Sequence, residues 1–235
     1  MDTSVLILAG GLATRLRPLT EKFPKALVPI LGKPFIHYQL QLLQSEGFHN
    51  IVLCIGYEGE QIREELGDGS NLGVSIQYSM DGKVLLGTGG AVMKALPLLS
   101  DPFLVLYGDS YLQVSYAAVL EKMQVYPEMQ ALMTVYQNGG NFDTSNVHFE
   151  NGKLLLYDKM NPRKEMNHID WGLGILRKSC FADTTEAKFD LAEVYMQLSQ
   201  QKKLLGYEVF QRFYEIGSHK GIADLEDFLK SEEIA

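Results

Sequence analysis

The first 29 residues join a short apolar strand, a pair of glycines and a row of cations, and this order limits the folds open to the chain. Residues 5–9 read VLILA and are followed by Gly10 and Gly11. A continuous apolar run of this length is typical of a strand covered on both faces. Two glycines directly after it let a ligand approach the backbone, because neither carries a Cβ. The segment therefore predicts an α/β protein with a ligand at the end of its first strand.

The cations that follow indicate what kind of ligand this is. Arg15 and Lys25 stand ten residues apart, and Pro18 and Pro24 stiffen the segment between them. Guanidinium and ammonium groups bind anions with several oxygens, so the pair predicts phosphates. The letters match neither G-x-x-x-x-G-K-[ST] nor G-x-G-x-x-G, so the two commonest nucleotide-binding loops are excluded. A basic loop that is merely solvated is the alternative.

The net charge of the chain is distributed unevenly. The chain has 21 Lys and Arg against 29 Asp and Glu, a net charge of −8, but residues 1–33 carry +3, which leaves −11 for the remainder. A basic loop on an acidic body favours a small anionic ligand over a nucleic acid or an anionic membrane surface. We therefore expect neither a nucleic-acid partner nor a membrane partner.

Length and composition predict a soluble cytoplasmic protein. With 235 residues, of which 46% are hydrophobic, the chain can bury one substantial core. Cys54 and Cys180 are too few for a disulfide framework, so we expect buried free thiols. The apolar stretch at the N-terminus is too short for a signal peptide, and no run reaches the roughly 18 apolar residues of a membrane helix. The oligomeric state is left open.

Strands and helices alternate through the first half of the chain. Apolar strands are expected at residues 5–9, 51–55, 74–78 and 103–107, and helices from Pro34 to about Gly47 and at 58–66, 89–99 and 114–125. This order predicts a mostly parallel, doubly wound sheet.

The second half has more, shorter strands. These are expected at residues 131–136, 146–150, 154–157, 171–176, 204–210 and 213–216, with helices at 191–201 and 221–229. Asn151-Gly152 is a strong signal for a two-residue hairpin. We expect one domain over residues 1–235, with a nucleotide-binding half to about residue 130 and a β-rich half from about residue 131.

Two further segments carry candidate binding residues. Gly87-Thr88-Gly89-Gly90 stands at an expected helix start, where free N–H groups and the Thr hydroxyl could bind a polar ligand. A glycine turn with Thr88 as a helix cap is the commoner explanation. Asp109 directly follows the strand 103–107, at the crevice where open α/β sheets bind ligands. It is therefore a candidate Mg²⁺ ligand, since Mg²⁺ binds through one or two carboxylates plus substrate phosphates; a turn or cap Asp is the alternative.

Three charged residues of the second half are also candidates. Asp158 and Lys159 follow a strand, so Lys159 could hold a second phosphate and Asp158 a hydroxyl, although a surface pair is the simpler explanation. Glu215 stands in an otherwise apolar strand. If it points inward its carboxylate needs a partner, and a metal is one; an outward Glu on an edge strand is the alternative.

Covalent catalysis has no candidate residue in this sequence. The histidines show no metal-ligand spacing, and no G-x-S-x-G segment is present. Neither cysteine has the exposed, basic surroundings of a nucleophile. The chemistry is therefore expected to need no protein nucleophile.

Taken in order, these motifs resemble those of the sugar-1-phosphate nucleotidyltransferases. They are LAGGLATRLRPLT, FPKALVPI, LGTGGA, YGD, DK and EIGS, and the resemblance extends from residue 4 to about residue 230. It implies the GT-A-like fold of nucleotide-diphospho-sugar transferases: a Rossmann-like, doubly wound mixed sheet with a β-rich sugar-binding elaboration. It also implies nucleotide-sugar biosynthesis, as used for cell-surface polysaccharide, in which an NTP and a sugar 1-phosphate give an NDP-sugar and pyrophosphate with Mg²⁺.

The resemblance also implies roles for individual residues. The implied roles are nucleotide binding for Leu8, Gly10, Gly11, Arg15, Lys25, Gly87 and Thr88, metal binding for Asp109 and Glu215, and sugar-phosphate binding for Asp158, Lys159 and Gly172. Arg15, Lys25 and Asp109 are the implied catalytic residues. Two positions depart from the family pattern: Ala13 replaces the more usual glycine, and Glu215 replaces the Asp that is the second metal ligand in relatives.

The implied mechanism agrees with the lack of a nucleophile. An oxygen of the sugar phosphate attacks the α-phosphorus in line and pyrophosphate leaves, so the protein supplies mainly positioning and charge neutralisation. LGTGGA is most similar to heptose guanylyltransferases, so we expect GTP with manno-heptose or mannose 1-phosphate. Uridylyl or cytidylyl transfer to another sugar 1-phosphate stays open.

Two readings outside this reaction also stay open. A non-catalytic, nucleotide-sugar-binding regulatory subunit is disfavoured by the presence of Arg15, Lys25 and Asp109. A Rossmann oxidoreductase is disfavoured because the chain lacks G-x-G-x-x-G.

Overall fold

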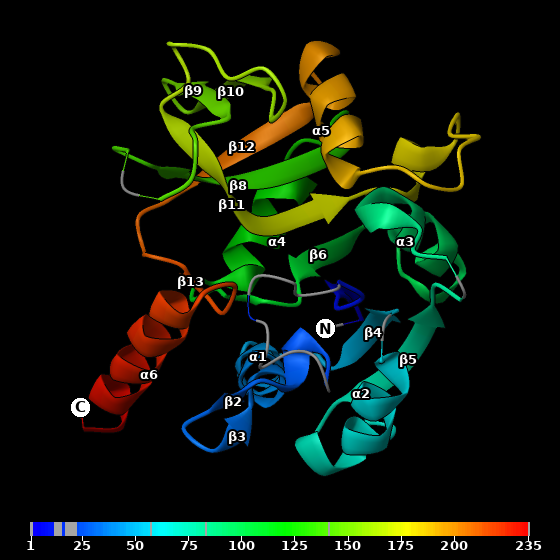
Figure 1. Ribbon diagram of the computed structural model, residues 1–235. Helices are drawn as coiled ribbons and strands as arrows, with labels where there is room; N and C mark the ends of the chain where they lie inside the picture. The colour runs from blue at the N-terminus through cyan, green and yellow to red at the C-terminus, as the bar shows by residue number, and fades with distance from the viewer. Residues whose placement is uncertain are drawn as a thin grey trace.

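The computed structural model describes residues 2–11, 16, 23–56, 58–82, 84–140 and 142–234. Arg15, a predicted phosphate-binding residue, and Ala13 lie outside these residues. In the described part of the chain a nine-stranded mixed sheet forms the centre of the molecule, and helices lie on both of its faces (Figure 1). The predicted fold class, a doubly wound mixed α/β sheet, is confirmed.

Four parallel strands from the first half of the chain form one side of the sheet. They are β1 (Val5–Leu8), β4 (Asn50–Ile55), β5 (Ser75–Met80) and β6 (Phe103–Tyr107). Their order is β5-β4-β1-β6, and each neighbouring pair is parallel. The chain moves outward from β1 to β4 and β5 and then returns to the other side of β1 with β6. The sheet therefore has a topological switch point between β1 and β6, which is where open α/β sheets bind ligands.

The second half of the chain extends this sheet beyond β6. Its strands are β8 (Ala131–Gln137), β9 (Val147–Glu150), β10 (Lys153–Tyr157), β11 (His168–Leu176) and β12 (Leu204–Val209). β11 is antiparallel to β6, with Leu173 opposite Leu106, and it pairs with β8 and β9 as well. Asn151 and Gly152 have φ values of 51° and 74° between β9 and β10, as expected for the predicted Asn-Gly hairpin.

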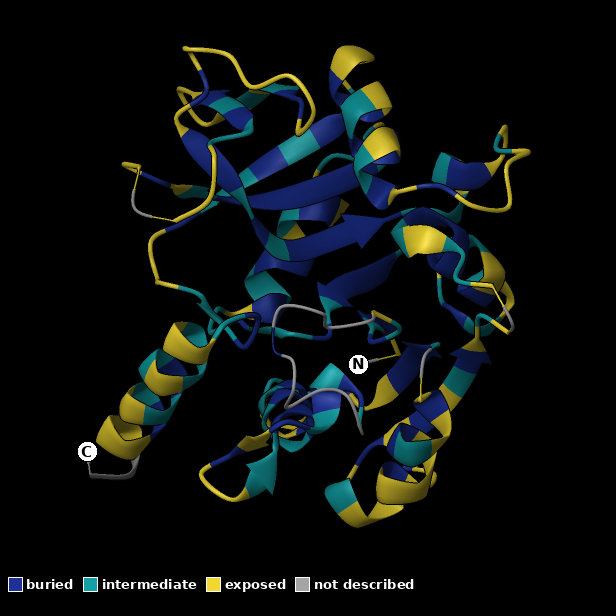
Figure 2. Cartoon of the chain, viewed as in Figure 1, coloured by how far each residue is buried: buried dark blue, intermediate teal, exposed yellow. Residues whose placement is uncertain are grey.

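Helices cover both faces of the sheet, and two apolar clusters separate them from it. α1 (Phe35–Ser45), α2 (Gly59–Leu66) and α4 (Tyr116–Gln124) pack on one face, and α3 (Gly87–Ala95) and α5 (Leu191–Gln200) pack on the other. The central strands are buried while the outer helix faces are exposed (Figure 2). α5 begins with a capping box formed by Asp190 and Glu193. The two-sided cover explains why β1, β4 and β6 are almost continuously apolar.

A third apolar cluster attaches the C-terminal helix α6 (His219–Ile234) to the N-terminal segment. It comprises Leu16, Val28, Ile30, Phe35, Tyr111, Ile216, Leu225 and Leu229. Two small antiparallel pairs stand beside it: β2 (Pro29–Ile30) with β3 (Lys33–Pro34), and β7 (Ser110–Tyr111) with β13 (Tyr214–Glu215). The β7–β13 pair brings the C-terminal segment back to the end of β6.

The boundaries of several elements differ from those predicted. β11 begins three residues earlier than expected, α6 is longer at both ends, and β13 has two residues instead of four. β2, β3 and β7 and the short 3₁₀ helices η3 (Lys25–Leu27), η4 (Ser70–Leu72), η5 (Leu96–Leu98) and η6 (Lys178–Phe181) were not expected. Of the two free thiols, Cys54 is buried as predicted but Cys180 is only partly buried. No helix among the described residues combines the length and apolarity needed to span a bilayer.

Candidate functional site

A cavity of about 260 Å³ opens at the switch point between β1 and β6. Its walls come from the ends of β1 and β6, from η3 and from the start of α3. Among the residues with predicted roles, those that line it are Leu8, Gly10, Gly11, Lys25, Gly87, Thr88 and Asp109. The structure thus brings the described nucleotide-binding candidates and Asp109 together around one cavity, although they come from four separate parts of the chain.

The glycines at this cavity have different roles in packing. A Cβ on Gly10 would lie 3.2 Å from Gly56 N, and a Cβ on Gly108 would lie 2.8 Å from Leu8 O. Both glycines therefore allow the ends of β1, β4 and β6 to approach closely. A Cβ on Gly11 would meet nothing within 4 Å. Close approach of a ligand to the backbone stays a prediction for both Gly10 and Gly11, and Gly10 has a packing reason besides.

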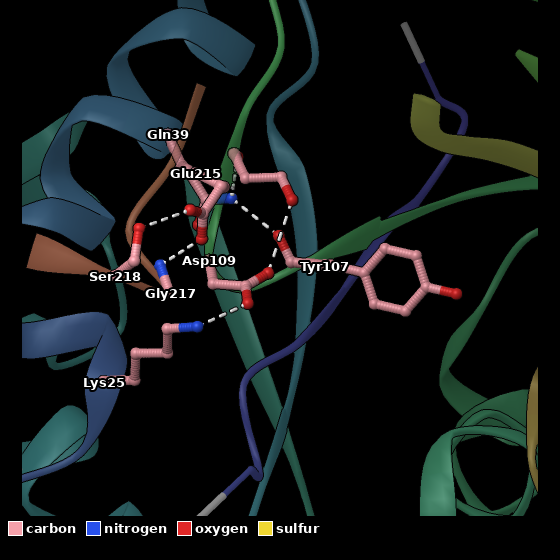
Figure 3. A network of polar contacts seen from close by, with 8 residues as sticks. Lys25, Gln39, Tyr107, Asp109, Glu215, Gly217 and Ser218 are labelled. Carbon is pink, nitrogen blue, oxygen red and sulfur yellow. Dashed lines mark hydrogen bonds and ion pairs between the residues drawn. The ribbon is translucent and has the colours of Figure 1, made fainter. Parts of the chain in front are cut away.

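Lys25 and Asp109 contact each other at the edge of this cavity. Lys25 Nζ lies 2.6 Å from Asp109 Oδ2, as Figure 3 shows. Lys25 begins η3 and Asp109 follows β6, so the ion pair joins two segments 84 positions apart. The side chains are 15% and 32% exposed, which leaves both accessible to a ligand. An ammonium and a carboxylate are thus held side by side where the sheet opens.

Gln39 of α1 holds the turn that carries Asp109. Its Nε2 donates to Tyr107 O at 2.9 Å and to Ser110 O at 2.6 Å, so it bonds the backbone on both sides of Asp109 (Figure 3). Gln39 itself is buried. Its role was not expected, because a single Gln on an amphipathic helix is ordinary.

Glu215 reaches the same turn from the C-terminal segment. In the β7–β13 pair Glu215 lies opposite Ser110, and Ile216 N donates to Asp109 O at 2.9 Å. Asp109 and Glu215 therefore stand on two directly paired backbone segments. The proximity was expected from the resemblance, but the short strand β7 that produces it was not.

The Glu215 carboxylate is also bound to the start of α6. It accepts hydrogen bonds from Gly217 N and from Ser218 Oγ, the latter at 3.0 Å. A Cβ on Gly217 would overlap Glu215 Oε2 and lie 3.0 Å from Lys25 Nζ. Glu215 Oε2 and Lys25 Nζ thus lie on the same side of Gly217. Glu215 is neither the outward edge residue nor a free carboxylate, since it also holds the two residues that precede α6.

Asp109 and Glu215 form a donor set that suits a divalent cation. Both provide hard carboxylate oxygens, which Mg²⁺ prefers, and the ammonium of Lys25 shows that a cation is accommodated at Asp109 Oδ2. Within the described residues no group of three or more His, Cys, Asp and Glu side chains could hold a metal. A two-carboxylate site therefore needs further oxygens from a substrate, as is usual for Mg²⁺ at phosphates.

Gly87 and Thr88 line the cavity and also dock α3 on the segment before α5. Thr88 Oγ1 donates to Asp190 Oδ1 at 2.9 Å and accepts from Leu191 N at 2.8 Å. Gly87 has a φ of 72°, and a Cβ there would lie 2.5 Å from Phe189 O. The capping alternative for Thr88 therefore applies, but to the N-terminus of α5 and not to its own helix.

Two unpredicted residues, Cys54 and Asp81, line the same cavity. Burial, reinforced by the Asp81 carboxylate, raises the pKa of the Cys54 thiol to about 12. The thiol is therefore protonated at neutral pH, in keeping with the lack of a nucleophile candidate. Burial raises the pKa of Asp81, whose Oδ2 accepts a hydrogen bond from Leu86 N at 3.2 Å.

The sugar-phosphate candidates lie in the second half of the sheet. Asp158 is buried, and its Oδ1 accepts from the backbone N–H groups of Met160 (3.0 Å) and Asn161 (2.9 Å), so it stabilises its own turn after β10. Lys159, next to it, is exposed. Gly172 has a φ of 101°, a conformation that favours glycine. Asp158, Lys159 and Gly172 are not among the residues that line the 260 Å³ cavity.

Comparison with known proteins identifies the family. Residues 4–141 match the nucleotidyl transferase family. Over 221 residues the chain is 34% identical to N-acetylmuramate alpha-1-phosphate uridylyltransferase of Neisseria meningitidis, covering 91% of this chain and 92% of the relative. It is 29% identical over 214 residues to D-glycero-alpha-D-manno-heptose 1-phosphate guanylyltransferase of Campylobacter jejuni, covering 90% and 93%.

A solved structure agrees at the level of the fold. HddC from Yersinia pseudotuberculosis, in complex with GMP-PN, has a TM-score of 0.78 and 22% identity, with 97% of this chain and 99% of the other covered. The chain belongs to the nucleotidyl transferase family. The resemblance drawn from the motifs and the expectation of an enzyme of this class are thereby confirmed.

Proposed function

We propose that the protein transfers a nucleotidyl group from an NTP to a sugar 1-phosphate and releases pyrophosphate. The observation that carries the proposal is the Lys25–Asp109 pair at the switch-point cavity, with Glu215 on the neighbouring strand. Phosphoryl transfer requires preorganised charge next to the reacting phosphates, and a cation beside two carboxylates suits that need. The names of the two relatives, both sugar-1-phosphate nucleotidyltransferases, support it.

The proposed reaction exchanges one phosphorus–oxygen bond for another. An oxygen of the sugar phosphate forms a bond to the α-phosphorus, the bond from the α-phosphorus to the bridging oxygen breaks, and pyrophosphate leaves with the electron pair. The sugar phosphate is already an anion at neutral pH, so no protein base is needed. Lys25, and Arg15 by the family resemblance, would stabilise charge on the NTP phosphates.

Asp109 and Glu215 would hold Mg²⁺, which when bound supplies charge neutralisation and orients the phosphates. Gln39 would keep Asp109 in place through its two backbone hydrogen bonds. Lys159 is assigned to the phosphate of the sugar, because it is an exposed cation of the second half of the chain. Its charge lowers the pKa of Asp170, and the Asp170 carboxylate accepts a hydrogen bond from Gly172 N. Asp158 would shape the turn that presents Lys159.

One observation favours GTP as the donor. Asp81 lines the same cavity as Gly87 and Thr88, the residues expected to contact the base. A carboxylate can accept two hydrogen bonds from the N1–H and N2–H groups of guanine, whereas uracil offers a single N–H between two carbonyl oxygens. The similarity to the heptose guanylyltransferase agrees with GTP, and the similarity to the uridylyltransferase keeps UTP as the second candidate.

Pyrophosphate release tests this proposal. Each of the four NTPs is combined in turn with mannose, manno-heptose, glucose and N-acetylmuramate 1-phosphate. The assays use the parent protein, Asp81→Asn, and Asp183→Asn as a control at an exposed position. We expect the highest kcat/KM with GTP, and a loss of about tenfold or more in the preference for GTP over UTP in Asp81→Asn only. A preference for UTP in the parent would replace GTP in the proposal. Binding of NTP and sugar phosphate without pyrophosphate release would favour a regulatory subunit.

A further inference from the structure

Gln39 of α1 carries the one buried side-chain polar atom that lacks a hydrogen-bond partner among the described residues. The residue is 3% exposed, and its Oε1 accepts no hydrogen bond there. A buried acceptor without a donor destabilises the folded protein, and an apolar side chain of similar size would avoid this cost. The cost is therefore retained for something that the nitrogen of the same amide does.

The Gln39 amide cannot turn over to relieve this cost. Its Nε2 donates to Tyr107 O at 2.9 Å and to Ser110 O at 2.6 Å (Figure 3). After a flip of the amide, Oε1 would face two carbonyl oxygens, and none of these three atoms is a donor. The unpaired Oε1 is thus the consequence of placing one nitrogen between the end of β6 and the start of β7.

The two carbonyl groups lie on either side of Asp109, in a turn that other segments hold as well. Gly108 N donates to Leu8 O of β1, and Ile216 N donates to Asp109 O, each at 2.9 Å. Gln39 adds a connection to α1, whose apolar side chains belong to the core beneath the sheet. The backbone that carries Asp109 is thus fixed to β1, to the residue after β13 and to α1.

The hydrogen bond to Ser110 O also bears on the spacing between the two proposed metal ligands. Ser110 follows Asp109 in the chain, and it pairs with Glu215 across β7 and β13. Its side-chain Oγ lies 3.3 Å from Asp109 Oδ1. Gln39 therefore holds the residue that connects the backbone of one carboxylate to the backbone of the other.

We infer that Gln39 is a positioning residue that makes the Asp109–Glu215 site selective for Mg²⁺ over Ca²⁺. Mg²⁺ requires near-ideal octahedral geometry with oxygens at about 2.0–2.1 Å, whereas Ca²⁺ accepts variable geometry at about 2.3–2.6 Å. A loosened spacing between the two carboxylates therefore weakens Mg²⁺ binding more than Ca²⁺ binding. Removal of a partner that orients a metal ligand typically changes metal affinity by about 10–100-fold. The inference rests on the proposed function, to which the metal site belongs.

Competition for bound Mn²⁺ tests the inference independently of turnover. Each protein is mixed with Mn²⁺ and an α,β-methylene NTP analogue, with the protein in excess over the analogue, and Mg²⁺ or Ca²⁺ is then added. Electron paramagnetic resonance follows the release of Mn²⁺ and gives the ratio of the Kd for Ca²⁺ to the Kd for Mg²⁺.

Two variants of Gln39 and one control are compared with the parent. Gln39→Met has a similar length and no N–H group, and Gln39→Asn keeps the amide but is one methylene too short to reach both carbonyl oxygens. Leu43→Ala is the control, because Leu43 is buried in the same helix and its truncation removes core packing without removing a hydrogen bond to the turn. Circular dichroism shows whether each variant folds.

We expect the ratio of the Kd for Ca²⁺ to the Kd for Mg²⁺ to fall by about tenfold in both Gln39 variants and to stay at the parent's value in Leu43→Ala. An unchanged ratio, an equal loss of affinity for both ions or the same shift in Leu43→Ala would overturn the inference. Failure of both Gln39 variants to fold, or a parent that binds no Mn²⁺, would overturn it as well.

The pyrophosphate assay separates this inference from the proposed function. Pyrophosphate release by the parent, together with an unchanged ratio in the Gln39 variants, would overturn the selectivity alone. A shifted ratio in the Gln39 variants, with no pyrophosphate released by the parent from any donor, would support the positioning role of Gln39 and count against the proposed function.

Discussion

Lys25 Nζ and Asp109 Oδ2 lie 2.6 Å apart. The same carboxylate oxygen thus contacts the lysine proposed to bind phosphate and belongs to a proposed metal ligand. Two cations cannot both make a short contact to the same oxygen without repelling each other. A metal at Asp109 would therefore compete with Lys25, and the NTP phosphates would offer the ammonium another anion. The pair connects metal binding to nucleotide binding in a way that separate sites would not.

Replacing Lys25 should have opposite effects on turnover and on metal affinity. Lys25→Ala removes charge stabilisation at the NTP phosphates, so kcat should fall by about 10²–10³-fold. It also removes a competing cation, so Mn²⁺ binding without nucleotide, followed by electron paramagnetic resonance, should become tighter. Lys153→Ala, an exposed control, should change neither quantity. If Lys25→Ala keeps a kcat within threefold of the parent, Lys25 does not belong to the site.

The two carboxylates should differ in how far metal can compensate for their loss. Asp109→Asn should abolish activity at any Mg²⁺ concentration tested, because it removes the negative charge of the carboxylate that Gln39 holds in place at the end of β6. Glu215→Gln should raise the Mg²⁺ concentration needed for half-maximal rate and leave partial turnover, since the amide oxygen can still accept from Gly217 N and Ser218 Oγ before α6. Glu215→Asp should stay close to the parent. A Mg²⁺ titration of the rate decides, and an unshifted curve for Glu215→Gln would exclude it as a ligand.

Lys159 should act on the sugar phosphate and not on the NTP. Removal of a charged hydrogen-bond donor typically costs about 1.5–3 kcal/mol, so Lys159→Ala should raise the KM for sugar phosphate by about 10–100-fold. The KM for NTP should change little, because Lys159 is absent from the lining of the 260 Å³ cavity. Lys164→Ala is the matched exposed control. Equal effects on both substrates would contradict the assignment.

Asp170 should make the stability of the protein depend on pH. Burial raises its pKa from 3.8 to about 6, so between these values the folded protein binds a proton that the unfolded chain has released. The stabilising contribution is present in full below about pH 4 and is lost as the pH rises through about 6. At pH 7.5 Asp170→Asn should therefore be more stable than the parent by on the order of 1–3 kcal/mol.

Thermal unfolding of the parent, Asp170→Asn and the control Asp183→Asn at pH 7.5 and 4.5 measures this difference. The advantage of Asp170→Asn should shrink at pH 4.5, where Asp170 in the folded parent is neutral. Other titrating groups are common to all three proteins and cancel in the comparison. If the stability difference between Asp170→Asn and the parent does not change with pH, burial does not raise the pKa of the Asp170 carboxylate.

The fold could be predicted because local signals and the tertiary arrangement agree. The apolar strands 5–9, 51–55 and 103–107 are buried on both faces, and Asn151-Gly152 forms its hairpin. β7 and β13 were less readable, because a two-residue strand carries no periodicity of its own. β11 begins earlier than expected because His168 and Asp170 are polar yet lie within the paired strand.

Asp109 was predictable because it directly follows an apolar strand, and Lys25 because it belongs to the basic segment after the two glycines. Gln39 was missed, since it acts through the backbone of Tyr107 and Ser110, which only the tertiary fold places beside it. Thr88 was assigned to a ligand, and its hydroxyl also caps a helix about 100 residues away. Long-range contacts of this kind leave no trace in spacing. The role of Arg15 and the division into two halves stay predictions.

The fate of labelled oxygen tests the central claim most directly. A sugar 1-phosphate carrying ¹⁸O in its non-bridging phosphate oxygens is incubated with NTP, Mg²⁺ and enzyme, and the products are followed by ³¹P NMR. Attack of the sugar phosphate on the α-phosphorus predicts an NDP-sugar that keeps all of the label, including the oxygen between its two phosphorus atoms, and pyrophosphate that carries none. Asp109→Asn should give neither product. Labelled pyrophosphate, or hydrolysis of the NTP without formation of an NDP-sugar, would contradict the account.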